Sequence, residues 1–172
     1  MEYSKVKKIK KAAEQGNSIA QNNLGVMYES GDGVEQNFNK AFEWYEKAAL
    51  KGNDTAQCNL ADLYFLHNNE IRQPDAFNKA IEWFEKAASQ ENAYAQFKLG
   101  LIYQMADICD YKKSFDMLKK SALQGYTRAY SQLAYCYLRG EGVEKNITEA
   151  IKWYEKGAAE DDEYCQERLG DL

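Results

Sequence analysis

The chain has 172 residues, 45% of them hydrophobic and 28% charged, so it can bury a core without a disulfide or a metal. The formal net charge of −5 argues against sequence-independent binding to nucleic acid or to an anionic membrane. Proline occurs once, which favours long helices over a loop-rich β fold, and the single histidine, His67, argues against histidine-dependent catalysis.

The N-terminal segment lacks the apolar core of a signal peptide, because residues 1–5 run directly into a lysine-rich stretch. No apolar run approaches the roughly 18 residues that cross a bilayer. The four cysteines lie far apart in the sequence and form no CxxC pair, so zinc and redox-dithiol sites lack their usual spacing. We therefore expect a cytoplasmic protein with four reduced thiols, no metal and no other cofactor.

Two short sequence blocks alternate along the chain. The first reads Ala20-Gln-Asn-Asn-Leu24-Gly25 and returns at Ala56, Ala95, Ala129 and, cut off, at Cys165. The second reads Lys40-Ala41-Phe-Glu-Trp44-Tyr45 and also recurs. Both blocks place small and apolar residues on one side at helical spacing, so each predicts an amphipathic helix. In chain order we predict a half-repeat helix, four helix–turn–helix repeats and the start of a further first helix, at residues 1–17, 18–53, 54–92, 93–126, 127–162 and 163–172.

Local signals mark the ends of these helices. Capping-box spacing occurs at the starts of two first helices, in the pairs Ser18 with Gln21 and Asp54 with Gln57. Gly52 and Gly125 lie where second helices should end in a left-handed residue. Gly31-Asp32-Gly33 and Gly140-Glu141-Gly142 predict turns between paired helices.

The repeat at 54–92 lacks the turn glycines and has a longer connection, residues 65–78, which contains Pro74. Since this connection is polar around His67, we expect it to be the internal segment most sensitive to proteases. The two half-repeats at the chain ends either cap the stack with polar side chains or belong to a longer array, and the sequence leaves both interpretations open.

The pattern AxxxLGxxY, GxGV, KAxxWYxKAAxxG resembles the Sel-like repeat (SLR), a branch of the tetratricopeptide superfamily. The resemblance covers nearly the whole chain and is fullest at Ala20–Gly52 and Ala129–Asp161. It departs locally in the third repeat, where Met117-Leu118 replaces the Trp-aromatic pair. The resemblance implies an all-α fold, a right-handed α-solenoid of tandem antiparallel helix pairs.

The sequence gives little support for a catalytic site or a metal site. Cys58 and His67 would need hydrogen-bond contact for nucleophilic catalysis, but a helix and a bend separate them. His67, Glu70 and Asp75 lack the spacing of cation ligands. The Gly-x-Gly turns lie between helices rather than after a strand, so they are not phosphate loops. We therefore predict that the protein is not an enzyme.

The side of the first helices that faces away from the packing stripe is too apolar for a plain solvated surface. In the tetratricopeptide superfamily this side is the inner, concave surface that binds peptides. The resemblance therefore predicts a partner-binding set on it: Asn22, Val26, Asp62, Phe65, Phe97, Leu101, Gln104, Tyr135, Leu138 and Arg139. The competing interpretation is that Phe97, Leu101 and Tyr135 pack between neighbouring repeats.

The function that this resemblance implies is a non-catalytic adaptor or scaffold that binds a protein or peptide on its concave face. One alternative is a dedicated inhibitor, such as a bacterial immunity protein that clamps a toxin or an enzyme. A hydrolase is the least supported alternative. We expect no nucleic-acid partner and no membrane insertion.

Overall fold

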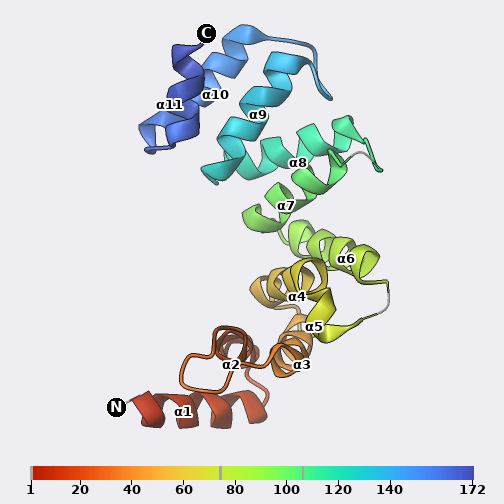
Figure 1. The fold of residues 1–172 in the computed structure, drawn as a ribbon, viewed down its shortest axis with the longest axis vertical. Coiled ribbons are helices and arrows are strands. Elements are labelled where there is room, and N and C mark those ends of the chain that lie inside the picture. The colour runs from red at the N-terminus through yellow and green to blue at the C-terminus, as the bar shows by residue number, and fades with distance from the viewer. Residues whose placement is uncertain (1, 74, 106) are drawn as a thin grey trace. The chain divides into compact units, whose positions relative to one another are not determined.

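The computed structural model describes residues 2–73, 75–105 and 107–172, and it leaves out the side chains of residues 2–5, 68 and 70. Every regular element among the described residues is an α-helix (Figure 1). The chain divides into two units, Met1–Gln90 and Glu91–Leu172. Pro74, which interrupts the longer connection at 65–78, lies outside the described residues.

In unit 1, α2 is paired to α3 and α4 is paired to α6, α1 packs on α2, and α3 packs on α4. The helices of this unit are α1 (Glu2–Glu14), α2 (Ser18–Ser30), α3 (Phe38–Ala49), α4 (Asp54–Leu66), α5 (Asn68–Ile71) and α6 (Ala76–Ser89).

Unit 2 repeats the same scheme, with α7 paired to α8, α9 paired to α10, and α11 packed on α10. Its helices are α7 (Ala93–Tyr103), α8 (Tyr111–Leu123), α9 (Arg128–Arg139), α10 (Ile147–Ala159) and α11 (Glu163–Gly170). The predicted fold class, an α-solenoid of tandem antiparallel helix pairs, is confirmed.

Small residues in the first helices let the second helices come close, as the sequence blocks predict. A Cβ atom added to Gly25 would lie 2.5 Å from the ring of Tyr45, and one added to Gly100 would lie 2.6 Å from Leu118 Cγ. Tyr45 and Leu118 are themselves fully buried. In these two pairs, a bulky side chain of the second helix therefore packs directly against a glycine of the first.

The predicted capping boxes are wrong. Asn17 and Asn53 are the N-caps, and their side chains accept hydrogen bonds from the backbone N–H groups of Ala20 and Ala56. Ser18 and Asp54 are already the first helical residues, because an asparagine one position earlier meets the same need.

Gln21 and Gln57 perform a different task from the one the capping box implies. The Nε2 of Gln21 donates to the carbonyl of Ala13 at 3.0 Å, and that of Gln57 to the carbonyl of Ala49 at 3.1 Å. Both carbonyls belong to the end of the preceding second helix, where no intrahelical donor is available. These glutamines therefore join one repeat to the next.

The predicted left-handed glycines are confirmed, with φ of +83° at Gly52 and +84° at Gly125. Part of the connection at 65–78 is helical. Helix α4 continues to Leu66, the short helix α5 follows, and Ile71 is buried. His67 stacks on Phe38 with 4.4 Å between ring centroids, so the histidine helps to hold this connection against α3.

Candidate partner-binding surface

Each first helix carries its candidate residues at fixed steps after the opening alanine. The sixth residue after it is Val26, Asp62, Leu101 or Tyr135, and the ninth is Glu29, Phe65, Gln104 or Leu138. We call the surface formed by the sixth, ninth and tenth residues the first-helix face. Because these steps differ by three or four residues, the side chains lie along one side of each helix.

In unit 1, Asn22 belongs to the packing between repeats. Only 8% of it is exposed, and its Oδ1 accepts a hydrogen bond of 2.9 Å from Asn59 Nδ2, which joins α2 to α4. Asn22 therefore has no surface to offer a partner, and its assignment to the binding set is corrected. Val26 is 43% exposed and does present apolar surface.

Asp62 and Phe65 of α4 are both half-buried. The Phe65 ring contacts the Phe77 ring of α6 at 5.9 Å between centroids. Burial raises the pKa of Tyr45, and the hydrogen bond to Glu29 and the negative charges of Glu29 and Asp62 raise it further. Asp62 therefore lies close to the core as well as on the face, and unit 1 offers a mixed surface.

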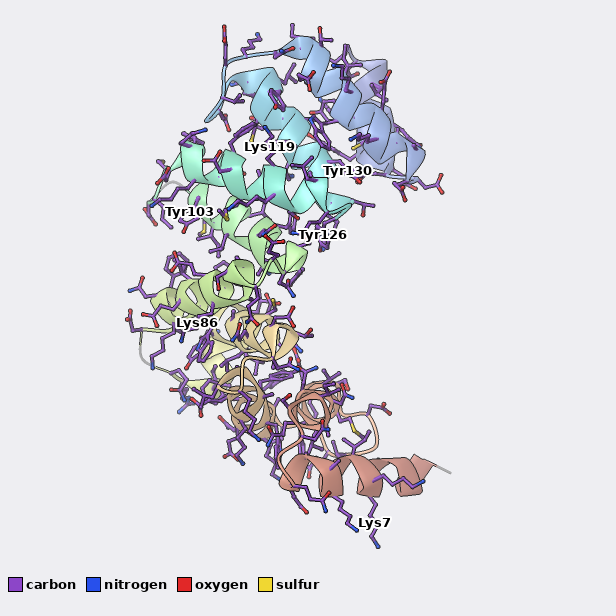
Figure 2. The ribbon with its side chains drawn as sticks, turned by 180° about the vertical axis from the view of Figure 1, so that it is seen from behind. Lys7, Lys86, Tyr103, Lys119, Tyr126 and Tyr130 are labelled. Carbon is purple, nitrogen blue, oxygen red and sulfur yellow. The ribbon has the colours of Figure 1, made fainter. Side chains whose placement is uncertain are left out.

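In unit 2, Phe97 is the second residue whose assignment is corrected. Only 6% of it is exposed. Its ring lies 5.1 Å from that of Tyr126, which follows α8 (Figure 2), and the Arg128 guanidinium lies 5.8 Å from its centroid. The packing interpretation holds for Phe97, because the second residue after the opening alanine points toward the neighbouring first helix, as at Asn22.

The rest of the set in unit 2 is available at the surface. Gln104 Nε2 donates to Cys136 Sγ at 3.6 Å, so α7 and α9 lie next to each other there. Tyr135 is 36% exposed, Arg139 is exposed, and Leu101 and Leu138 are half-buried against the core. Met105, which the binding set omits, is 40% exposed on the same face. Its place one step beyond Gln104 is the signal that would have included it.

The second helices carry three tryptophans, of which Trp44 and Trp83 are half-buried and Trp153 is buried. Each tryptophan there has a lysine three residues later, and the ammonium group covers the ring. The distances from Nζ to the ring centroid are 4.2 Å for Lys47 over Trp44, 3.8 Å for Lys86 over Trp83 and 4.1 Å for Lys156 over Trp153 (Figure 2 labels Lys86). Charge therefore covers these three tryptophan rings, whereas Phe77, Tyr111, Leu123 and Ile147 of the second helices are exposed.

The chemistry of the buried thiols does not suit catalysis. Burial raises the pKa of Cys136 to about 12 and that of Cys165 to about 12, so both remain protonated at neutral pH. Cys58 is buried in α4, whereas His67 lies beyond the end of that helix and stacks on Phe38. The structure does not bring this pair together as a catalytic unit.

Asp75, one of the three residues that lack the spacing of cation ligands, makes a contact of its own. Asp75 Oδ1 accepts a hydrogen bond from Asn78 Nδ2 at 2.7 Å, and the side chain of Glu70 lies outside the described residues. Across residues 2–73, 75–105 and 107–172, no three His, Cys, Asp or Glu side chains gather as metal ligands would. In the same part of the chain, every helix is too short or too polar to span a bilayer.

Tandem helix pairs, packed closely through small residues such as Gly25 and Gly100, define an α-helical repeat module. The sequence profile of the Sel1 repeat matches residues 18–53, 54–92, 93–126 and 127–162. The chain therefore belongs to the Sel1-repeat family, which is typically non-catalytic and generally mediates protein–protein interactions.

Three known proteins illustrate the likeness. The SLR-fold protective antigen c5321 of uropathogenic Escherichia coli is 36% identical with a TM-score of 0.87, over 95% of this chain and 35% of that one. The rat DAP3-binding cell death enhancer 1 is 32% identical over 162 residues, which are 94% of this chain and 32% of the relative.

The immunity protein PA5088 of Pseudomonas aeruginosa shares the fold alone, with 24% identity and a TM-score of 0.62 over 93% of this chain and 58% of that one. The chain spans between 18% and 32% of the length of the curated relatives that it matches.

Proposed function

We propose that this protein is a non-catalytic adaptor that binds a protein or peptide partner on the first-helix face of α7 and α9. The proposal rests on the apolar side chains that this face presents. Tyr135 and Met105 are exposed on it, and Leu101 and Leu138 are half-buried. Uncovered apolar groups that lie close together mark interaction sites more often than chance exposure does.

The five remaining residues of the set in unit 2 each have a role in this proposal. Tyr135 and Leu138 supply apolar contact from α9, and Leu101 supplies it from α7. Gln104 and Arg139 orient the partner, since polar groups around an apolar centre fix direction and register. The rat relative supports a protein partner in general, because its name describes it as binding another protein.

Two alanine substitutions test the assignment. Tyr135→Ala should weaken binding by about 1–3 kcal/mol with little change in stability, because its ring lies at the surface. Phe97→Ala should lower the free energy of unfolding by about 3–5 kcal/mol, because its ring is buried. The partner is first obtained by co-purification from the native host, and its fragments are titrated against both folded variants. Unchanged affinity in folded Tyr135→Ala would refute the proposed surface.

The same measurement separates the adaptor from the inhibitor. An adaptor should release a short segment quickly at about micromolar affinity, whereas an inhibitor should bury a folded partner and dissociate slowly. Dissociation rates from intact partner and from its fragments distinguish the two.

We also propose a cytoplasmic location with reduced thiols, which rests on the separate positions of the cysteines. Alkylation of the unreduced protein from its native host, followed by mass spectrometry, tests this proposal. An intramolecular disulfide would contradict it.

A further inference from the structure

The charged residues of the first helices differ in sign between the two units. Helices α2 and α4 of unit 1 contain no lysine or arginine, and their three carboxylates are those of Glu29, Asp54 and Asp62. Helices α7 and α9 of unit 2 contain no carboxylate, and their three cations are those of Lys98, Arg128 and Arg139. The whole chain has 27 acidic and 22 basic residues, so α7 and α9 run against its average charge.

The fold does not require a cation at these positions. Arg139 takes the position that is Ser30 in α2 and Leu66 in α4, and Lys98 takes that of Asn23 in α2. All four repeats nevertheless form the same kind of helix pair. A role in folding therefore does not explain the cations of unit 2.

Arg128 is even placed against the stability of its own helix. It is the first residue of α9, and a positive charge at a helix N-terminus opposes the helix dipole. The first turn of α9 has no acidic residue, and within the described part of the chain the side chain of the N-cap, Thr127, accepts no capping hydrogen bond. A residue that breaks a local rule of helix stability at an exposed position points to a binding role.

Two arginines frame the apolar part of the first-helix face. Arg128 lies at the start of α9, and its guanidinium is 5.8 Å from the ring centroid of Phe97 in α7. Arg139, the last residue of α9, lies about three turns and about 16 Å further along the helix, so both side chains project on the same side. Tyr135 and Leu138 lie between them in α9 and supply the apolar contact.

The positive charge of this face is not neutralised within the described chain. Both arginines are exposed, and neither forms an ion pair with any residue that the structure describes, although Glu141 closely follows Arg139 in the sequence. In the next first helix, α11, Arg168 pairs with Glu167 at 3.8 Å and with Asp171 at 3.3 Å. The carboxylates there are thus used locally.

Resting on the proposed function, we propose that the partner segment bound by the first-helix face of α7 and α9 is acidic, with apolar residues between two carboxylates. Arginine suits this task, because its planar group donates two parallel hydrogen bonds to one carboxylate. In an extended segment, which rises about 3.3 Å per residue, carboxylates that reach Arg128 and Arg139 lie about five residues apart. The apolar residues between them contact Tyr135 and Leu138, and Lys98 adds positive charge from α7.

Selection from a displayed library of random peptides tests the charge preference. Peptides of about twelve residues are long enough to follow α9 in an extended conformation. Those that bind the 172-residue chain should be richer in Asp and Glu than the input library, with apolar residues between the carboxylates. In the tightest synthetic peptide, replacing Asp and Glu by Asn and Gln should weaken binding at least about tenfold. Added salt should also weaken binding, because the arginines are exposed.

Charge reversal on the protein tests the arginines themselves. Arg128→Glu/Arg139→Glu should weaken the acidic peptide at least about tenfold, whereas a peptide with Lys in place of Asp and Glu should bind this variant better than it binds the parent chain. The melting temperature should stay close to that of the parent, because a carboxylate favours the first turn of α9 and disfavours the last. The matched control, Lys119→Glu/Lys120→Glu, makes the same change in net charge on exposed positions of α8 and should bind the acidic peptide as the parent does.

The outcomes separate this inference from the proposed function. Neutral or basic peptides that lose affinity in Tyr135→Ala would overturn the acidic preference and leave the proposed surface standing. Peptides that bind Tyr135→Ala unchanged would refute the surface and this inference together. A library that yields no binding peptide, or an equal loss in the Lys119→Glu/Lys120→Glu control, would overturn the inference alone, because co-purification with the native partner tests the surface separately.

Discussion

The first and fourth repeats, at 18–53 and 127–162, share the same turn glycines and the same tyrosine, yet the two hydroxyl groups differ. The Tyr45 hydroxyl donates to Glu29 Oε2 at 2.5 Å. The Tyr154 hydroxyl is buried and finds no hydrogen-bond partner among the described residues. The ninth residue of the first helix explains the difference, because it is Glu29 in one repeat and Leu138 in the other.

One position therefore serves either the core or the surface. Glu29 satisfies a buried donor, whereas Leu138 adds apolar area to the first-helix face and leaves Tyr154 without an acceptor. A buried hydroxyl without a partner costs about 1–3 kcal/mol. The fourth repeat thus carries a stability cost at the same position where the proposed partner site gains a contact.

The largest expected difference between the two repeats lies in the turns. A Cβ added to Gly142 would meet the backbone oxygen of Tyr111, and its φ is +74°. The same addition at Gly33 would meet Val6 Cγ2 at 2.7 Å and Met27 Cε at 3.5 Å, and both side chains can move. We expect Gly142→Ala to cost about 3–5 kcal/mol and Gly33→Ala about 1–2 kcal/mol, since both have left-handed backbone.

Urea denaturation of the two variants measures this difference. Gly140→Ala is the matched control, because its φ is also +74° but its nearest neighbour, Lys145 Cβ, lies 3.4 Å away. It should cost only the left-handed strain, about 1–2 kcal/mol. Equal losses for Gly140→Ala and Gly142→Ala would contradict the role of the Tyr111 backbone.

Removing each tyrosine hydroxyl is the next test. Tyr45→Phe should lower the free energy of unfolding by about 1.5–3 kcal/mol, because it removes a hydrogen bond to a carboxylate. Tyr154→Phe should be neutral or stabilise by up to about 1 kcal/mol, because it removes a hydroxyl without a partner. Thermal and urea unfolding measure both, and an equal loss in the two variants would show that Tyr154 has an acceptor in solution.

Placing a carboxylate at residue 138 of the fourth repeat should raise stability and weaken partner binding. Leu138→Glu places an acceptor where Glu29 lies in the first repeat, so it should stabilise the protein by about 1 kcal/mol. It also puts a charge in the proposed apolar site and should weaken partner binding at least about tenfold. The control is Leu138→Met, which keeps the side chain apolar and should preserve binding.

The last difference between the two repeats concerns alkaline pH. Burial raises the pKa of Cys136 from 9.0 to about 12, and the first repeat has Met27 at this position. The unfolded chain releases this proton above pH 9 while the folded protein keeps it. The free energy of unfolding should therefore fall by about 1.4 kcal/mol per pH unit between pH 9 and pH 12. Cys136→Ala should reduce that slope in urea titrations, and an unchanged slope would exclude the thiol as its source.

The repeat spacing predicted the helix pairs because the requirement for small residues at Gly25 and Gly100 is local and recurs. It did not predict how the exposed side of a first helix divides between packing and surface. Asn22 and Phe97 point toward a neighbouring first helix. Their burial depends on the angle between the two helices, and a helical wheel of one helix holds no information on that angle. The Asn17 cap was missed because Ser18 satisfies the same pattern one residue later.

Gln57 links more than two helices. Its Nε2 donates to the carbonyl of Ala49, and its Oε1 accepts a hydrogen bond of 2.8 Å from Gln90 Nε2. The end of α3, the start of α4 and the end of α6 thus share one amide group. When unit 1 is stretched along its chain, these three helices should yield in a single step, because none can fray without breaking the bonds of the others. Force spectroscopy would detect that step as one extension longer than a single helix allows.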